Sequence, residues 1–352
     1  MRAKASGEDS SRPPTLKTLA EALGLSASTV SRALSGDPAV TRKTVARVIE
    51  MAEQLGYRRD LRGVNLRTGK TFTLCAVLGA PPSQEFGDPS AMHLIQGLIA
   101  GVEGTDFKIV MRPIETAEQR FEAVKEAALN GRFDGIVLDH TEPQDPAVLF
   151  LLEKKIRFVT FGRTELFSDH PYFDIDNEHA AYIATRHLIE HGHTRIAMID
   201  PPGKFLFCRQ RMRGYRRALE EGGIAFDESL IAEISIGARR VRERVLQMLP
   251  ARARPTGFVT SNEVATLGAI SAGRTLPADE CARLQFVSRD GTNMFDYFEP
   301  PVSSCFYSLL DAGEYLAGAL VKAVEGVPTT ALQTVERVSF IERPHRTISE
   351  TI

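Results

Sequence analysis

Three polar side chains follow apolar runs at positions where a ligand could bind. Arg209 lies in CRQRMRGY, after an apolar run that ends near Asp200. Asn262 follows the run GFVTS, and Asp290 follows LQFVS. Ligands of open parallel α/β sheets bind at the carboxyl ends of the strands, where these donors and acceptors would suit the hydroxyl groups of a sugar. Each residue also has a structural interpretation: a surface charge for Arg209, a helix cap for Asn262 and a turn residue for Asp290.

A second group of polar side chains lies in residues 1–70, which carry 13 Lys+Arg and 7 Asp+Glu, a net charge of +6. The whole chain of 352 residues has a formal net charge of −2, which leaves −8 for the rest. A basic head on an acidic body suits a protein that meets phosphate at one end only. A chance excess of cations in a short segment is the alternative.

The spacing of apolar residues predicts three helices in this basic segment. They cover residues 16–23, capped by Thr15 and ended by Gly24; residues 26–34, capped by Ser26; and residues 41–55. The first apolar face is Leu16, Leu19, Ala20 and Leu23, and the third is Val45, Val48, Ile49 and Ala52. Two short helices joined by a glycine turn and closed by a third form a helix-turn-helix unit, whose second helix would lie in the DNA major groove.

From Phe72 onward, short apolar runs alternate with helical patterns. The predicted strands are 74–78, 108–111, 135–138, 157–161, 195–199, 257–260 and 284–287, and the predicted helices are 117–130, 177–191, 212–221, 239–249 and 262–272. This alternation predicts an α/β fold with parallel sheets covered on both faces. Because the strands are too many for one small domain, we expect two open sheets side by side with a cleft between them.

Signals for other chemistry are weak. The scattered cysteines form no CxxC pair and are expected to be reduced, as in the cytosol (Cys75, Cys208, Cys281 and Cys305). We expect no signal peptide and no membrane span. His191-Gly192-His193 is better explained by a helix end at Gly192 than by a metal site, and Gly97, Gly101 and Gly104 do not have the spacing of a dinucleotide loop. No GxSxG, P-loop or HExxH motif is present, so we expect no enzyme, cofactor or metal.

The sequence resembles the LacI/GalR family of bacterial transcriptional regulators in LAEALGLSASTVSRALSG, VTRKTVARVIEMAEQLGY and LRTGKT. The resemblance covers nearly the whole chain from Thr15 onward and is weaker after Thr73. It implies a helix-turn-helix head, a hinge helix, and a two-subdomain body like that of periplasmic sugar-binding proteins. The chain would cross between subdomains near Ile175, Cys305 and Val327. The expected divisions are a disordered tail (1–14), the DNA-binding domain (15–59), the hinge (60–71), the effector-binding and dimerisation domain (72–343) and a C-terminal tail (344–352).

The resemblance also implies residue roles in the head. Ala27, Ser28 and Arg32 match base-reading positions, and the short Ala27 and Ser28 side chains suggest that Arg32 makes the strongest base contact, to guanine. The expected phosphate contacts are Ser26, Thr29, Ser31 and Thr44, and Thr15 and Leu16 belong to the same surface. Leu66 matches the hinge leucine that inserts into the minor groove and bends the duplex. A plain linker, which would account for the charge, is the alternative. Gly63 replaces a usual alanine and weakens a helix by about 1 kcal/mol, so we expect hinge folding to depend more than usual on DNA.

In the body, the resemblance implies that Arg209, Asn262 and Asp290 contact the effector. Arg163 and Asp88 are further candidates, and Phe86 is either a stacking platform for a sugar ring or simple packing. Arg289 stands where the family often has an aromatic residue, so the resemblance implies a more polar pocket wall.

Taken together, these patterns predict a cytoplasmic, nucleoid-associated homodimer that binds double-stranded operator DNA and represses carbohydrate genes under control of a sugar or glycoside. The opening LKTLAEALGLS looks most like members that control α-glucoside uptake. A nucleobase effector or an activator role are the alternatives within the family. A sugar-binding protein or a sugar-processing enzyme are more distant ones. The C-terminus has no heptads, so a coiled-coil tetramer is not implied.

Overall fold

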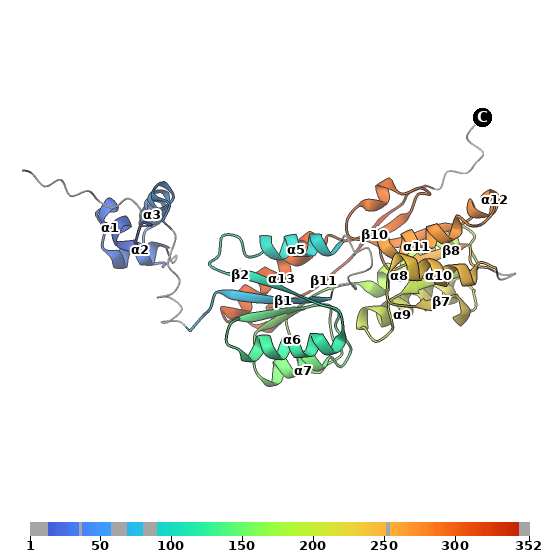
Figure 1. Cartoon of the computed structure of the whole chain (residues 1–352), viewed down its shortest axis with the longest axis horizontal. Helices are drawn as coiled ribbons and strands as arrows, with labels where there is room; N and C mark the ends of the chain where they lie inside the picture. Colours follow the sequence, from blue (N-terminus) through green and yellow to red (C-terminus); the bar gives the residue numbers. More distant parts are fainter. Residues whose placement is uncertain (1–12, 35–36, 58–68, 80–89, 251–253, 345–352) are drawn as a thin grey trace, which may run out of the picture. The chain divides into compact units, whose positions relative to one another are not determined.

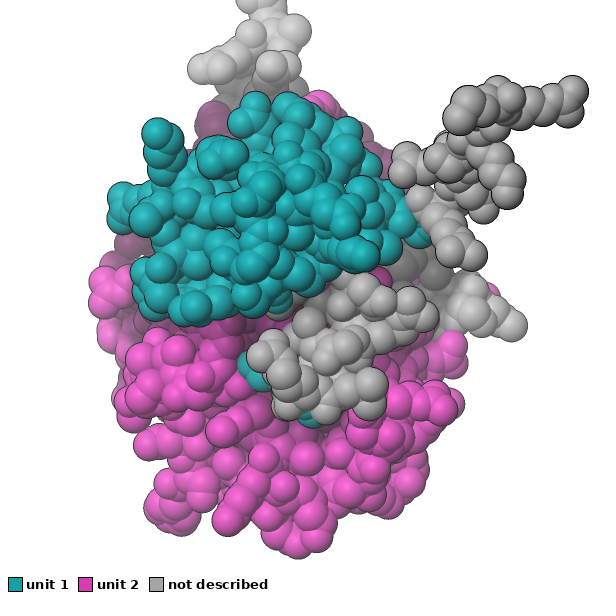
Figure 2. Space-filling view, turned by 90° about the vertical axis from the view of Figure 1, so that its left-hand side faces the viewer, with its two compact units in different colours: residues 1–70 teal, residues 71–352 magenta. Residues whose placement is uncertain are grey.

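The chain separates into two compact units, residues 1–70 and residues 71–352, which we call the head and the body (Figure 2). The computed structural model describes residues 13–34, 37–57, 69–79, 90–250 and 254–344. The expected tails at 1–14 and 344–352 and the expected hinge at 60–71 lie mostly outside these ranges. Within the described ranges, no helix is long and apolar enough to cross a membrane.

The head confirms the three predicted helices, which are α1 (Leu16–Leu23), α2 (Ala27–Leu34) and α3 (Arg42–Leu55). Each begins with a side-chain oxygen that accepts a backbone N–H: Thr15 from Thr18 at 3.2 Å, Ser26 from Thr29 at 3.1 Å, and Thr41 from Thr44 at 3.3 Å. The first helix ends at Gly24, whose φ of 65° is the left-handed conformation that glycine adopts without strain.

The core of the head is a narrow stripe from each helix, centred on Leu19, Val30 and Val48. In α3, one residue of the predicted apolar face does not join this core: Ile49 is 46% exposed. Ile49 lies about 100° around the helix from Val48. In so small a core, the partly buried Met51 and Tyr57 pack against the buried cluster instead.

The body contains two six-stranded sheets (Figure 1). Sheet A has the order β11-β5-β4-β3-β1-β2, and its strand pairs are all parallel. Its strands are β1 (Thr73–Gly79), β2 (Lys108–Ile114), β3 (Gly135–Leu138), β4 (Phe158–Phe161), β5 (Tyr172–Ile175) and β11 (Gln333–Glu336). The helices associated with it are α5 (Ser90–Ala100), α6 (Ala117–Leu129), α7 (Pro146–Glu153) and α13 (Leu309–Val324).

Sheet B has the order β12-β10-β9-β8-β6-β7, in which only the β10–β12 pair is antiparallel. Its strands are β6 (Ile196–Asp200), β7 (Ile231–Glu233), β8 (Gly257–Thr260), β9 (Gln285–Asp290), β10 (Ser303–Phe306) and β12 (Ser339–Ile341). Its helices are α8 (Asn177–Glu190), α9 (Leu206–Glu221), α10 (Ala238–Met248), α11 (Glu263–Gly273) and α12 (Ala278–Cys281). The described part of the body also contains three short 3-10 helices: η1 (Glu228–Leu230), η2 (Met294–Tyr297) and η3 (Thr329–Leu332).

Both faces of each sheet are covered, which explains the continuous apolar runs. In β1, Leu74, Ala76 and Leu78 belong to the buried cluster with α5 and α13, whereas Cys75 and Val77 belong to the cluster with α6 and α7 (Figure 1). Successive side chains of a strand point to opposite faces, so a strand covered on both sides must be apolar at every position.

The chain passes between the subdomains three times. It leaves sheet A after β5 at Ile175, returns after β10 at Phe306, and crosses again between β11 and β12 at residues 337–338. The expected third crossing near Val327 is therefore misplaced by about ten residues. After Val327 the chain first adds η3 and the parallel edge strand β11 to sheet A.

All seven predicted strands are present, but five strands were not predicted: β5, β7, β10, β11 and β12. Each has only three or four residues, and three of them lie at sheet edges, where fewer positions are buried. Helix α9 begins at Leu206, six residues before its predicted start at Met212.

Two of the three glycines that did not fit a dinucleotide loop, Gly97 and Gly101, allow two helices to touch. A Cβ on Gly97 of α5 would lie 2.0 Å from the carbonyl oxygen of Leu310, and a Cβ on Gly313 of α13 would lie 2.3 Å from that of Leu94. Contacts this short are far below van der Waals separation, so α5 and α13 can approach only where both lack side chains.

We expect Gly97→Ala to lower the free energy of unfolding by about 1–3 kcal/mol, because the added methyl group meets backbone that cannot move freely. The matched control is Gly318→Ala in α13, where the nearest atom to an added Cβ is 4.0 Å away. That change should be neutral or stabilise by up to about 1 kcal/mol, because alanine favours the helix. Chemical denaturation of both variants measures the difference, and equal losses would contradict the close-contact explanation.

Candidate DNA-binding face and candidate ligand cleft

The outer side of α2 carries the three side chains expected to read bases. Val30 and Ala33 point into the head core, whereas Ala27, Ser28 and Arg32 are exposed. Ser26 links this face together, because its Oγ lies 2.9 Å from Ser28 Oγ and 2.8 Å from Thr29 Oγ1. A groove-facing helix surface of short hydroxyl side chains and one arginine allows close approach to base edges.

Most of the residues expected to contact phosphate, and Thr15 of the same surface, lie at helix starts, whereas Ser31 lies in the middle of α2. Thr15 and Ser26 cap α1 and α2, and Thr44 lies in the first turn of α3, 2.9 Å from the Thr41 hydroxyl. Helix N-termini favour anions, because unpaired backbone N–H groups and the helix dipole meet there. Leu16, Thr29 and Ser31 are half-buried, and Leu66 lies outside the described residues.

Arg32 makes a contact that the sequence analysis missed. Its Nε donates to Asp37 Oδ2 at 2.8 Å. This hydrogen bond, together with one from the backbone N–H of Ala39, holds the pKa of Asp37 below its usual value. The carboxylate therefore stays ionised beside the guanidinium.

The two subdomains of the body enclose a cavity of about 470 Å³. Its lining comes from the ends of most strands, including Gly79 at the end of β1, Asp139 after β3, Asp174 in β5, Ser261 after β8 and Arg289 in β9. This is where parallel α/β sheets place ligands. The volume is within the range typical of small-molecule sites.

The structure corrects the predicted arginine. Arg209 is exposed, lies outside the cavity lining and donates from Nε to the carbonyl oxygen of Gly203 at 3.0 Å. Arg211 lines the cavity instead, with Nη1 donating to Asp200 and Nε donating to Asn177 Oδ1 at 3.2 Å. Because Arg209 and Arg211 are two positions apart in the sequence, their side chains point roughly 200° apart around α9. Phe207, four residues before Arg211, shares its face and stacks beneath its guanidinium at 4.6 Å.

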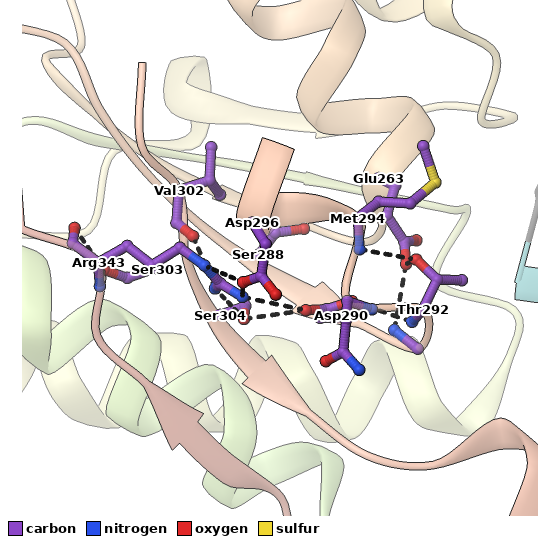
Figure 3. A network of polar contacts seen from close by, with 12 residues as sticks. Glu263, Ser288, Asp290, Thr292, Met294, Asp296, Val302, Ser303, Ser304 and Arg343 are labelled. Atoms are coloured by element: carbon purple, nitrogen blue, oxygen red, sulfur yellow. Dashed lines mark hydrogen bonds and ion pairs between the residues drawn. The ribbon is translucent and has the colours of Figure 1, made fainter. Parts of the chain in front are cut away.

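Asp290 does not line the cavity either. It is fully buried, and its Oδ1 accepts backbone N–H groups from Thr292 at 3.0 Å and Asn293 at 2.9 Å, while Ser304 donates to Oδ2 at 3.2 Å (Figure 3). Its alternative interpretation as a turn residue is the one that the contacts support. The turn that it fixes also bonds Glu263 of the cavity wall, because Glu263 accepts from Thr292 Oγ1 at 2.8 Å.

The remaining candidates are divided. Asn262 lines the cavity and also caps α11, accepting the N–H of Ala265 at 2.9 Å. Arg163 lies outside this cavity and donates from Nε to Asp174 at 2.6 Å. Phe86 and Asp88 lie outside the described residues.

Arg289 lies in the part of the cavity wall that sheet B contributes. Arg289 donates to the hydroxyl of Tyr307 and lies over its ring, 4.8 Å from the centroid. Burial and the neighbouring Arg211 lower the pKa of the Arg289 guanidinium. Three lining atoms are buried and have no hydrogen-bond partner in the described part of the chain: Arg120 Nε, Ser261 Oγ and Arg289 Nε.

On the side of the cavity formed by sheet A, Asp139 carries a lowered pKa. Burial disfavours its negative charge, but His140 and the N–H of Gly79 hold the pKa of Asp139 below its usual value.

The histidines near the end of α8 have structural partners. His191 caps α8, and its Nδ1 contacts the carbonyl oxygen of His187 at 2.7 Å. Both ring nitrogens of His193 are bonded, to Thr256 at 2.8 Å and to Gln285 at 2.9 Å. His187, His191 and Glu342 lie within reach of one another, but the first of these histidines already contacts Gln285. We therefore assign no metal site to this cluster.

Comparison with known proteins supports the same two-part organisation. Residues 15–60 match the lacI family of bacterial regulatory proteins, and residues 185–344 match the periplasmic binding protein-like domain. The chain is 32% identical over 343 residues to the HTH-type transcriptional regulator AglR of Rhizobium meliloti, covering 94% of each chain. The chain belongs to the LacI family. It is a helix-turn-helix transcriptional regulator, as the sequence predicted.

This LacI-family regulator also resembles CelR of Thermobifida fusca, at 26% identity over 97% of this chain and 98% of CelR. It is 28% identical to RafR of Escherichia coli over 91% of this chain and 94% of RafR. Its fold matches that of a solved transcriptional regulator CelR–cellobiose complex, with a TM-score of 0.70, 24% identity, and coverage of 94% of this chain and 99% of that chain. The predicted fold class is therefore confirmed.

We expect Asp290→Ala to destabilise the body rather than remove a ligand contact. Two part-buried backbone N–H groups and the buried Ser304 hydroxyl would lose their acceptor, at up to about 1–3 kcal/mol each. Asp296→Ala is the matched control. Both aspartates form an ion pair with Arg343, but Asp296 is 56% exposed, so its loss should cost far less. Thermal melting of both variants measures the difference, and a normal melt for Asp290→Ala would contradict its structural role.

Proposed function

We propose that this regulator represses genes of carbohydrate uptake or catabolism. Its head binds operator DNA through α2, and a sugar or glycoside bound in the cleft of the body controls that binding. We further propose that it acts in the cytoplasm on the nucleoid and as a homodimer, because two heads are needed to read a two-fold symmetric site.

The observation that carries the DNA-binding proposal is the exposed face formed by Ala27, Ser28 and Arg32 on α2, in a head whose three helices begin with exposed hydroxyl caps. The exposed cations Lys17, Arg42, Lys43 and Arg47 add a phosphate-attracting charge to the same unit. Phosphate contacts set the position of such a head, and base contacts give it sequence preference.

The sugar proposal rests on the mixture of polar groups in the cavity wall. Arg120 and Arg289 offer donors, Ser261 offers a hydroxyl, and Glu263 offers a carboxylate. A sugar hydroxyl both donates and accepts, so one ligand can satisfy neighbouring groups of both kinds. The related fold of CelR was solved in complex with cellobiose, which makes disaccharides the first ligands to test.

The dimer proposal is supported by exposed apolar side chains on the first subdomain. Met92 and Ile99 lie two turns apart on α5, and Val110 lies on the edge strand β2. Apolar side chains grouped in this way are typical of a surface covered by another subunit. Sedimentation of the full chain, with Met92→Glu as the disrupting variant, tests this proposal.

A thermal-shift screen with cellobiose, maltose, sucrose, raffinose, adenine and guanine tests the class of effector. A ligand present at 100 times its dissociation constant adds about 2.7 kcal/mol to the stability of the folded state. If only a nucleobase stabilised the protein, the sugar proposal would be wrong and the alternative of a nucleobase effector would take its place. Measuring DNA binding with and without the identified ligand then shows whether the ligand releases the protein from DNA or strengthens its binding.

We expect Arg289→Gln to weaken binding of the ligand found in that screen by about tenfold to a hundredfold, the value of a charge-assisted hydrogen bond of about 1.5–3 kcal/mol. Arg209→Gln is the matched control and should leave affinity unchanged, because Arg209 is exposed and outside the cavity. Isothermal titration calorimetry measures both. The reverse pattern would restore Arg209 as the ligand contact.

We expect Arg32→Ala to reduce operator affinity by roughly 1–3 kcal/mol while leaving most of the salt-sensitive binding to random DNA. Selection from a randomised duplex library supplies the preferred sequence. Fluorescence anisotropy then compares that duplex with a random one for wild type and variant. Equal losses on both duplexes would mean that Arg32 contacts phosphate only.

A further inference from the structure

The turn after α2 fixes one carboxylate next to the arginine that we assign to base reading. The backbone N–H of Asp37 donates to the carbonyl oxygen of Arg32 at 3.0 Å, and the carbonyl oxygen of Asp37 accepts from Val40 at 2.9 Å. The Asp37 side chain is held from both sides: Oδ1 accepts from the N–H of Ala39 at 2.9 Å, and Oδ2 accepts from Arg32 Nε at 2.8 Å. The position of this carboxylate is thus set by the backbone of the turn.

Stability does not account for this pair. The side chains of Arg32 and Asp37 are 56% and 31% exposed, and exposed ion pairs contribute little to folding. Asp37 also places a negative charge beside the face that meets DNA, where phosphate repels it. The hydrogen bond from the Ala39 N–H to Oδ1 already fixes the turn, so the second contact, from Arg32 to Oδ2, is the one that a role in recognition would explain.

We propose that Asp37 is a positioning residue that orients Arg32 for a bidentate contact with a guanine. The proposal rests on the proposed function, in which α2 reads the major groove. A guanidinium is a rigid planar fork, so a carboxylate that holds Nε fixes the direction of the Nη1–Nη2 edge. Guanine O6 and N7 accept two parallel N–H groups from such an edge, and no other base presents this pair.

This arrangement has two consequences of opposite sign. Asp37 increases the preference of the head for its own site, because a held guanidinium loses less rotamer freedom when it meets guanine. It also weakens binding to random DNA, because its charge opposes phosphate contacts. A merely structural aspartate would change neither quantity in this combination.

The informative variant is Asp37→Asn, whose side-chain oxygen can still accept from Ala39 but which has lost its charge. We expect the ratio of affinities for selected and random duplexes to fall by about tenfold, while affinity for random DNA rises. Glu53→Gln is the matched control, because it removes one negative charge from the exposed surface of α3. That variant should bind both duplexes slightly more tightly and keep their ratio.

The experiment uses the full chain and the duplex obtained by selection from a random library. Anisotropy titrations at two salt concentrations compare wild type, Asp37→Asn, Glu53→Gln, Arg32→Ala and the double variant Arg32→Ala/Asp37→Asn. Circular dichroism establishes that each head is folded. A double variant with the same ratio as Arg32→Ala alone is the expected result, since Asp37 would then act through Arg32.

Three results would overturn the proposal: an unchanged ratio in Asp37→Asn, an equal fall in Glu53→Gln, or a further fall in the double variant. An unchanged ratio in Arg32→Ala is a different failure, because it would remove the base-reading role itself. In that case the assignment of Arg32 under the proposed function fails first. If Arg32→Ala lowers the ratio and Asp37→Asn does not, only the positioning role is lost.

Discussion

The body depends on one constraint, which is that both faces of each parallel sheet are covered by helices. Strand side chains must then be apolar at successive positions, as they are in β1. Polar groups that serve a ligand are left with the strand ends and the loops that follow. The cavity wall has this composition, with Asp139, Ser261 and Arg289 each at or just beyond the end of a strand.

The cavity wall is costly to build, because charges leave water there. Arg211 is buried and satisfied by Asp200 and Asn177, so its removal would leave an uncompensated carboxylate. Asp290 does not line the cavity, but it fixes the turn that bonds Glu263, which does (Figure 3). The geometry of the wall therefore depends on residues that do not line the cavity.

The head is much smaller than the body and buries few of its side chains. Its core is a narrow apolar stripe, so most side chains remain outside and polar. The hydroxyl groups that begin the helices stabilise them and also lie at helix N-termini, which favour anions in general. Ser26, which caps α2, has a short side chain, as do Ala27 and Ser28, which share the exposed face with Arg32.

The sequence by itself determined the local features of this protein. Caps and apolar spacing predicted α1, α2 and α3, and the long apolar runs predicted seven strands, because these signals depend on neighbouring residues. The three- and four-residue strands such as β7, β11 and β12 were missed, since partners far away in the sequence stabilise them.

Tertiary structure alone decided which polar residues meet. It placed Arg211 rather than Arg209 in the cleft, through the rotation of α9 against sheet B. It assigned Asp290 to a turn and paired Arg32 with Asp37. A motif gives the order of such residues along the chain. The direction of a side chain depends on where its helix begins and what the helix packs against, and these are properties of the folded whole.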